Sequence, residues 1–272
     1  MNILIVFCAL SIASYMLFSK RLSTSSNWQA TVTPLASIMG SGFLVSAPLL
    51  SGIAGNYAVF AMALLLFIAY CIGSAIRFNI KYFEDIEQQK GTAQTIGFIS
   101  RILLMCSYFI SVSYYLQLLA AFLLNLIHID NLLYAKILST SILTLIALVG
   151  IIKGLGKLEK VEKFTIAINF AMIGALILSL ILYNFHLFQI GTWQLKELPF
   201  QLTSNHMRVL LGLLIVVQGF ETSRYLGARH PKDQRIKTMR SAQIISSGIY
   251  LAFLFFVTIL FKKDMGTNIT AI

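Results

Sequence analysis

The sequence predicts an all-α protein that crosses a lipid bilayer several times. Hydrophobic residues make up 58% of its 272 residues and charged residues only 11%, whereas soluble domains carry about 25% charged residues. Several segments approach the roughly 20 apolar residues that a helix needs to cross a bilayer. A transmembrane β-barrel is excluded, because its strands would give short segments of alternating hydrophobicity.

Eight apolar segments are expected to form transmembrane helices within one integral membrane domain, residues 1–272. The first segment has no basic residue before it, and Lys20 and Arg21 follow it. A cleaved signal peptide has the opposite arrangement, so we expect this segment to stay as an extra helix with the N-terminus outside. The eight segments lie at residues 3–18, 30–51, 56–76, 96–124, 132–152, 164–183, 207–227 and 241–261.

Basic residues are distributed unevenly between these segments. With the N-terminus outside, most of the 21 Lys and Arg residues fall on the inner side, after the first, third, fifth and seventh segments. This bias is typical of a multi-pass protein, and it explains the net charge of +11 without a nucleic-acid partner. We therefore expect a multi-pass protein of the plasma (inner) membrane. The longest outer loop, residues 183–207, contains Trp193 and is expected to lie along the membrane surface.

Cysteine and histidine give no sign of a catalytic or metal site. Cys8, Cys71 and Cys106 are far apart in apolar segments and are interpreted as buried hydrophobic residues. The four histidines lack the spacing of metal ligands, and no Ser–His pairing falls at membrane depth. We therefore expect neither an enzyme, nor a bound metal, nor a cofactor.

The second segment is interrupted at its middle by Gly40-Ser41-Gly42, with Pro34 and Pro48 on either side. Glycine destabilises a helix interior by about 1 kcal/mol relative to alanine, so the segment is expected to break here. Backbone groups freed inside a membrane are tolerated only where they line a cavity or are buried in protein. Close helix packing against these small residues is the alternative explanation.

The seventh segment is also interrupted. Its apolar run at 209–217 covers only about 14 Å as a helix, so the crossing must include Gly219 and Glu221. An ionisable residue at that depth is expected to face protein or water; alternatively the helix ends early and Glu221 pairs with Arg224 at the inner surface. Two discontinuous helices, near 40–42 and 218–221, are typical of inverted-repeat secondary transporters.

At these breaks the chain resembles the amino acid–polyamine–organocation (APC) superfamily, which has the LeuT-type fold. The family's first core helix carries a GSG break, matched by residues 40–42, and its sixth carries a GFE-like break, matched by residues 219–221. A basic loop follows in the family, and residues 230–243 keep its first proline, Pro231, but not its second. The resemblance covers about residues 30–261. The extra helix before it is more similar to sodium:solute symporters, which share the fold.

The resemblance implies an inverted-repeat transporter fold that is incomplete. Residues 30–183 correspond to the first five-helix repeat, and residues 207–261 to the start of the second. Core helices eight to ten have no counterpart in the sequence. We therefore expect either a fragment or truncated reading frame, which we favour, or a chain whose partner supplies the remaining helices.

The resemblance also implies a binding site for a small organic solute at the two breaks, with the third core helix as one wall. Amides near Ser41 and Gly42 would bind a substrate carboxylate, and carbonyls near Gln218 and Gly219 would bind its ammonium group. Hydrogen bonding between helices is the alternative role for the serine and tyrosine side chains. The expected substrate-binding residues are Ser37, Gly40, Ser41, Gly42, Ser111, Tyr114, Tyr115, Gln218, Gly219 and Phe220.

Coupling to Na⁺ or H⁺ is expected, with two candidate residues. The usual sodium site of the fold needs hydroxyls from core helix eight, which the sequence lacks. Asn169 aligns with a lysine of some proton-coupled relatives but cannot hold its charge, and Glu221 is a candidate proton carrier. The expected function is secondary active transport of amino acids or similar small organic solutes. A sodium-coupled symporter of another solute class, and a non-transporting receptor or assembly subunit, are the alternatives.

Overall fold

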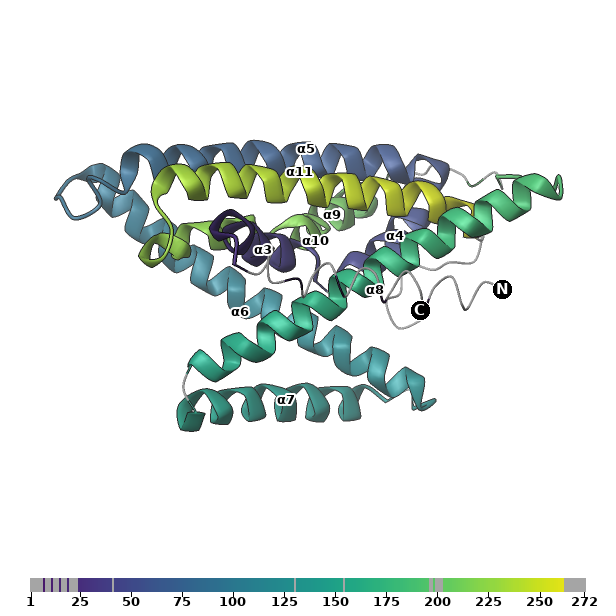
Figure 1. Cartoon of the computed structure of the whole chain (residues 1–272), viewed down its shortest axis with the longest axis horizontal. Helices are drawn as coiled ribbons and strands as arrows, with labels where there is room; N and C mark the ends of the chain where they lie inside the picture. Colours follow the sequence, from purple (N-terminus) through teal and green to yellow (C-terminus); the bar gives the residue numbers. More distant parts are fainter. Residues whose placement is uncertain are drawn as a thin grey trace. The chain divides into compact units, whose positions relative to one another are not determined.

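The computed structural model describes residues 24–40, 42–129, 131–153, 155–195 and 203–261, together with five isolated positions, and it describes side chains outside 153–163. Within these residues every regular element is helical (Figure 1). Most of the predicted N-terminal helix at 3–18 lies outside the described residues, as does Ser41. The isolated positions are Phe7, Ser11, Tyr15, Ser19 and Leu198.

Six helical stretches of the described residues are long and apolar enough to cross a membrane. They confirm an all-α, multi-pass protein. The first of them contains the predicted segment 56–76 and part of the segment 30–51, so the predicted total of eight crossings stays a prediction. The stretches are Gly42–Phe83, Thr92–Leu126, Leu132–Ile152, Phe164–Gln189, Ser204–Ala228 and Lys232–Leu260.

The helices form two compact units. The first unit combines Met1–Lys81 with Thr165–Ile272, and the second is Tyr82–Phe164. The first therefore joins segments from the two ends of the sequence, and both predicted breaks belong to it.

The N-terminal part of the first unit holds α3, α4 and α5. Helix α3 begins where the Ser25 side chain accepts a hydrogen bond from the Trp28 amide, which satisfies one free N–H of the first turn. Gly55, with φ +52°, provides the tight turn between α4 and α5. The elements are α3 (Ser26–Ile38), α4 (Gly42–Ala54), η1 (Gly55–Tyr57), α5 (Ala58–Phe78) and η2 (Asn79–Phe83).

The C-terminal part of the first unit contains the second broken segment. Helix α8 (Leu155–Gln189) enters the unit at Thr165. The elements that follow are α9 (Ser204–Gly212), α10 (Leu214–Val217), η3 (Phe220–Ala228), α11 (Lys232–Val257) and η4 (Thr258–Leu260).

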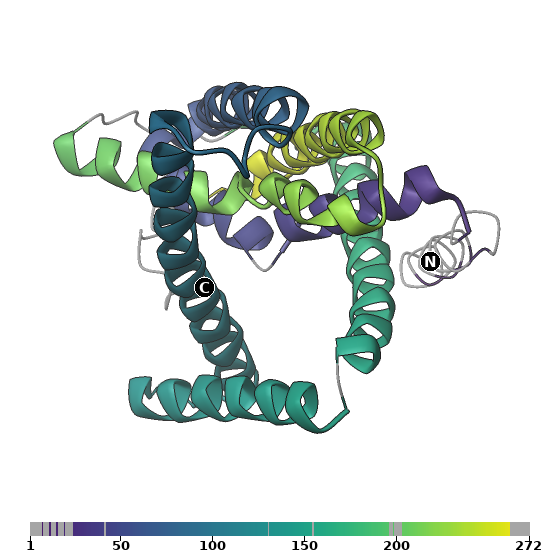
Figure 2. The ribbon, with the colours of Figure 1, turned by 90° about the vertical axis from the view of Figure 1, so that its left-hand side faces the viewer.

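Helix α11 forms the core of the first unit, because it packs along α3, α5 and η3 (Figure 1). Helices α5 and α11 run side by side, which Figure 2 shows from the end. The Phe43 ring meets Tyr250 edge-on, with 5.1 Å between ring centroids, and Phe253 at 4.4 Å. Such aromatic pairs add to the apolar burial that holds the helices together.

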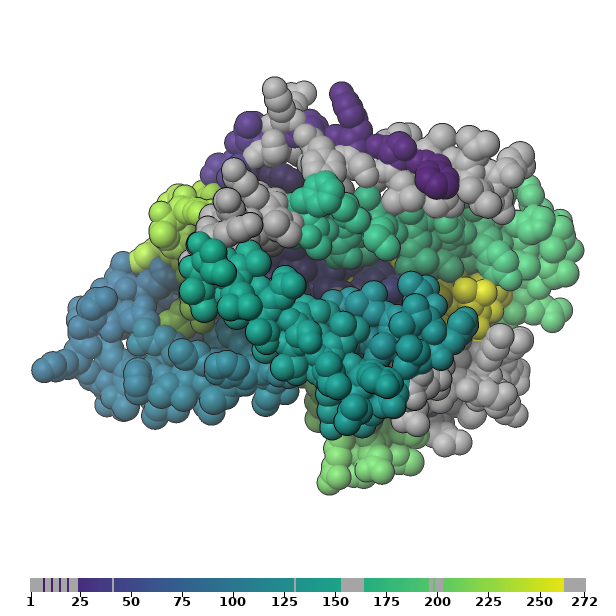
Figure 3. All heavy atoms as spheres, turned by 90° about the horizontal axis from the view of Figure 1, so that it is seen from below, coloured from purple at the N-terminus to yellow at the C-terminus, as the bar shows by residue number. Residues whose placement is uncertain are grey.

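The second unit is built from α6 (Thr92–Leu126) and α7 (Leu132–Lys153). They contact one another through a small apolar cluster of Ala120, Leu124 and Ala135, with Leu138 against it. Most other side chains of α7 lie at the surface (Figure 3), as expected of a helix that faces lipid.

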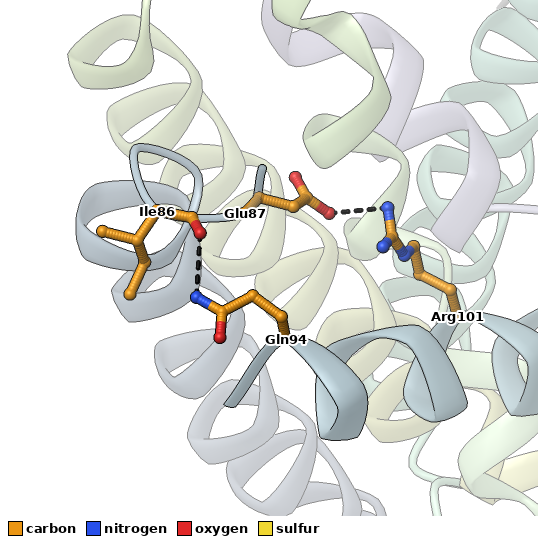
Figure 4. Close-up of polar contacts among 4 residues, drawn as sticks. All are labelled: Ile86, Glu87, Gln94 and Arg101. Atoms are coloured by element: carbon orange, nitrogen blue, oxygen red, sulfur yellow. Dashed lines mark hydrogen bonds and ion pairs between the residues drawn. The ribbon is translucent and has the colours of Figure 1, made fainter. Parts of the chain in front are cut away.

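The turn before α6 is fixed by two polar contacts (Figure 4). The Glu87 carboxylate pairs with the Arg101 guanidinium at 2.7 Å, and Gln94 Nε2 donates to the Ile86 carbonyl at 2.9 Å. An exposed pair of this kind contributes at most about 1 kcal/mol, so it orients the turn more than it stabilises the unit.

Two stretches that the sequence predicted as loops are partly helical in the structure. Helix α8 continues to Gln189, because no glycine or proline follows Tyr183 until Gly191, which has φ +69°. The predicted surface loop at 183–207 is therefore partly helix. Likewise α11 begins at Lys232, directly after Pro231, so most of the basic stretch 230–243 is helical rather than a loop.

Candidate functional site

The first predicted break separates α3 from α4. The Met39 amide donates to the Leu35 carbonyl at 2.9 Å, which closes α3, and the Phe43 amide donates to the Gly40 carbonyl at 3.1 Å. Met39 itself has φ −90° and ψ 40°, outside the helical region. The interruption therefore leaves the Met39 carbonyl outside the helical hydrogen-bond ladder.

The second predicted break separates α10 from η3. Gln218 is extended, with φ −80° and ψ 174°, and Gly219 has φ +118°, a conformation that glycine adopts far more readily than other residues. The Gly219 carbonyl accepts hydrogen bonds from the Thr222 amide at 3.2 Å and the Thr222 hydroxyl at 2.7 Å. The chain therefore changes direction at Gly219.

The two breaks touch one another. A Cβ added to Gly219 would lie 2.6 Å from the Ser37 carbonyl carbon and 2.8 Å from the Ile38 amide nitrogen. Because both neighbours are backbone atoms at the end of α3, they have little room to shift. Glycine is therefore required at position 219 by its contact as well as by its conformation.

Tyr250 of α11 connects the ends of both broken helices. Its fully buried hydroxyl lies 2.9 Å from the Val216 carbonyl oxygen and 3.1 Å from the Ile38 carbonyl oxygen. The single hydroxyl hydrogen can be donated to either of these oxygens. One side chain thus supplies the donor for two carbonyl groups that belong to the last turns of α3 and α10.

Asn169 of α8 supplies a second side-chain donor to the first break. Its Nδ2 donates to the Met39 carbonyl oxygen at 2.7 Å. This is the position that the resemblance aligned with a lysine. The amide satisfies the free carbonyl without introducing a charge.

Glu221 is buried next to the second break, with 6% of its surface exposed. Its Oε2 accepts a hydrogen bond from the Gly219 amide at 2.8 Å. Within the described part of the chain, the Glu221 carboxylate forms no ion pair with Arg224, although the sequence suggested that pair as an alternative. The Arg224 backbone carbonyl accepts a hydrogen bond from Arg235 NH1 at 3.0 Å. A buried carboxylate is costly unless it is hydrogen-bonded or paired, and the Gly219 amide supplies a hydrogen bond to Glu221.

The remaining predicted site residues of the first unit differ in their hydrogen bonds and in their exposure. The Ser37 hydroxyl donates to the Thr33 carbonyl at 3.1 Å, and the Ser37 atoms nearest to the second break are its carbonyl carbon and its Cβ. Gly42 and Phe220 are buried, whereas Gly40 and Gln218 are partly exposed. Ser41 lies outside the described residues.

Three predicted residues belong to the second unit. The Ser111 hydroxyl donates to the Ser107 carbonyl at 2.9 Å within α6. The rings of Tyr114 and Tyr115 lie 5.5 Å apart between centroids. Their contact with a substrate stays a prediction.

A shallow groove of about 730 Å³ follows α7 in the second unit. It is lined by ten residues of α7 from Leu133 to Ile152, spaced three and four apart along one helix face. This stripe carries no convergent polar groups from other helices. The two breaks, with their freed backbone groups, are therefore the better candidate site.

A polar network fixes the first turn of α3 to the start of α11. Gln234 Nε2 donates to Ser26 Oγ at 2.9 Å and to Asn27 Oδ1 at 2.8 Å. His230 Nδ1 lies 3.3 Å from Ser26 Oγ and 3.2 Å from Gln234 Oε1. The half-helix that ends at the first break is thus held at its other end as well.

The chain is similar to a known protein family. A family model described as "APC superfamily transporter" matches residues 20–272. The chain belongs to the APC superfamily. This is a family of transporters and not of enzymes.

A relative of this chain is a protein of Aquifex aeolicus (strain VF5) that is described as an "Uncharacterized protein". It is 38% identical over 258 residues, which cover 92% of this chain and 62% of the relative. The APC chain therefore spans less than two thirds of the length of that relative. No solved structure matches the chain.

Tyr250 and Gln234 are important residues of the site that the sequence did not indicate. A tyrosine in an apolar helix needs a partner for its hydroxyl, which is the only signal that Tyr250 offers. That signal does not reveal that the partners are Ile38 and Val216, which are far away in the sequence.

Proposed function

We propose that this APC protein is a secondary active transporter for amino acids or similar small organic solutes, which bind where the two helix breaks meet. The contact between Gly219 and the Ser37–Ile38 peptide supports this proposal most strongly. It joins two interruptions far apart in the sequence, and irregular backbone in a membrane protein is tolerated where it serves a cavity or protein interior. The choice of amino acids and of the plasma membrane rests on the resemblance to APC transporters.

The helix ends at the breaks have suitable charges for a zwitterionic solute. Helix α4 begins at Gly42, and its N-terminal amides carry the positive end of the helix dipole, which suits a carboxylate. Helix α10 ends at Val217, and carbonyl groups at this end suit an ammonium group. We assign the carboxylate of the solute to the first break and its ammonium group to the second.

Solute binding requires the two breaks to separate. Gly219 is in contact with Ser37, and Tyr250 bridges Ile38 and Val216. We infer that the described arrangement is a closed state, in which protein donors occupy the backbone carbonyls. A solute would displace some of these hydrogen bonds, so binding and the movement of α3 relative to α10 would be coupled.

Coupling to an ion is assigned to Glu221. Its carboxyl group is buried and accepts a hydrogen bond from Gly219 at the break itself. A change in its protonation therefore acts directly on the backbone that contacts α3. This supports H⁺ as the coupling ion, and Na⁺ is the alternative.

Binding of labelled amino acids to the purified protein, with and without a Na⁺ or H⁺ gradient in proteoliposomes, tests the proposal. We expect saturable binding that is lost in Gly42→Leu, because the larger side chain would cover the amides at the start of α4. Gly248→Leu is the matched control, since a Cβ at Gly248 meets nothing within 4 Å. Normal binding by Gly42→Leu would contradict the proposed site. Uptake that depends on Na⁺ alone, for other solutes, would favour the sodium-coupled alternative.

A further inference from the structure

Arg77 is a buried cation at the end of α5, outside the site described above. Only 8% of its surface is exposed. Its NH1 donates to Gln243 Oε1 of α11, and its guanidinium lies 4.8 Å from the ring centroid of Tyr70. Neither partner is an anion, and within the described part of the chain no carboxylate pairs with Arg77. A buried charge without a counterion is costly.

The position of Arg77 is set by close packing between α5 and α11. The Gln243 side chain fills the space beside Gly73, where an added Cβ would lie 2.4 Å from the Gln243 amide atoms. Gln243 Nε2 donates to the Ala69 carbonyl at 2.9 Å, which leaves its Oε1 directed at Arg77. The guanidinium is therefore held in place rather than free to move into solvent.

A second cation, Arg240, lies one helix turn before Gln243, the residue of α11 that Arg77 contacts. Arg240 of α11 is exposed and lies close enough for its charge to act on Arg77. Among the described residues Arg240 also lacks a carboxylate partner, and the exposed Lys237 precedes it by one helix turn. Two like charges at one helix seam repel one another unless an anion lies between them.

The expected position of the two arginines in the membrane indicates which kind of anion binds them. Arg77 lies at the end of α5 and Arg240 near the start of α11. The distribution of basic residues predicts that both of these helix ends lie at the cytoplasmic surface, where anionic lipid headgroups concentrate. The guanidinium group binds phosphate with two parallel hydrogen bonds. Ile244 lies one turn from Arg240 on the same face and is exposed, so it can contact an acyl chain.

We propose that Arg77 and Arg240 bind the phosphate of an anionic phospholipid headgroup at the seam between α5 and α11. Free inorganic phosphate shares this chemistry. The lipid is the better occupant because the exposed Ile244 offers its acyl chain an apolar contact beside Arg240. The bound headgroup would neutralise both cations and hold the two helices together.

Native mass spectrometry and thermal unfolding of the detergent-solubilised protein test this proposal. Phosphatidylglycerol should bind and raise the unfolding temperature, whereas phosphatidylcholine and inorganic phosphate should have little effect. Arg240→Gln should weaken phosphatidylglycerol binding by about fivefold, the loss expected for one basic residue near a membrane surface. The exposed Arg240 is the variant of choice because its removal leaves the Arg77–Gln243 contact in place.

Two further variants separate a headgroup site from general attraction of a basic protein for anionic lipid. Arg208→Gln in α9 removes the same charge elsewhere in the first unit and should bind phosphatidylglycerol as the wild type does. Arg77→Lys keeps the charge but loses the planar fork, and should bind more weakly than the wild type. Wild-type binding by Arg240→Gln, equal losses in Arg240→Gln and Arg208→Gln, or equal stabilisation by inorganic phosphate would each overturn the proposal.

Discussion

Gly219 and Ser37 pack so closely that a single added carbon atom at Gly219 would lie 2.6 Å from the Ser37 carbonyl carbon. The two residues come from different broken segments, and their contact involves the backbone and the Cβ of Ser37. It therefore constrains both breaks at once, and changes at either side of it test whether the breaks act together.

Gly219→Ala should destabilise the protein and abolish solute binding. The alanine would adopt a left-handed conformation that costs about 1–2 kcal/mol, and its Cβ would also overlap the backbone of α3. We expect a fall of at least about 2 kcal/mol in the free energy of unfolding. Unfolding in detergent and binding of labelled amino acids would measure the two effects.

Gly248→Ala is the control for this change. Gly248 lies inside α11, and an added Cβ meets nothing within 4 Å. Alanine there should leave binding intact and stabilise the helix by up to about 1 kcal/mol. Equal behaviour of the alanine variants at positions 219 and 248 would show that the contact with Ser37 is not formed in the membrane.

The sequence indicated the positions of both breaks because the signal is local. Gly40 and Gly42 interrupt one apolar run, and Gly219 ends another that is too short to cross a membrane. The contact between the breaks could not be predicted in the same way. It depends on how α3, α10 and α11 pack, which no single segment of sequence specifies.

Helix boundaries and side-chain partners were less predictable. The start of α11 is rich in Lys and Arg, so its low hydropathy suggested a loop, although Pro231 and Asp233 suit the start of a helix. Asn169 was identified by alignment with a lysine, but its bond to Met39 follows only from the structure. The Glu221–Arg224 pair was wrong as an alternative because Glu221 turns toward the Gly219 amide instead.

Tyr250→Phe should weaken the connection between the two broken helices without disturbing the apolar core. The phenylalanine ring keeps the edge-on contact with Phe43, but the carbonyls of Ile38 and Val216 lose their shared donor. Leaving such buried groups without a partner costs about 1–3 kcal/mol. Urea or thermal unfolding should show this loss, and the closed state should open more readily in hydrogen exchange.

The corresponding change in an exposed tyrosine provides the control. Tyr225 of η3 is 57% exposed, so Tyr225→Phe should have the stability of the wild type within about 0.5 kcal/mol. If Tyr250→Phe were equally neutral, the hydroxyl would have no part in holding α3 and α10 together.

Substitutions of Asn169 should follow their ability to donate a hydrogen bond to Met39. Asn169→Lys retains a donor and should keep much of the stability, whereas Asn169→Asp places an acceptor 2.7 Å from the Met39 carbonyl oxygen. At neutral pH the aspartate variant should therefore be the less stable of the two, by about 1–3 kcal/mol. Thermal unfolding in the same detergent measures the order, and the reverse order would mean that the bond to Met39 does not stabilise the break.

Glu221→Gln should separate the structural role of this residue from its role in coupling. The glutamine oxygen can still accept the hydrogen bond from the Gly219 amide, so the unfolding temperature should stay close to that of the wild type. The side chain can no longer gain or lose a proton. In proteoliposomes we expect exchange of solute across the membrane to persist while uptake driven by a pH gradient is abolished.

Arg224→Lys completes this test, because it changes a neighbouring charged residue that does not contact the Glu221 carboxylate. It should lower expression at most, and the purified variant should transport as the wild type does. If Glu221→Gln retained uptake with the pH dependence of the wild type, Glu221 would have no coupling role. Its burial beside Gly219 would then serve only to bind the amide that the break leaves free, a task that a neutral side chain performs equally well.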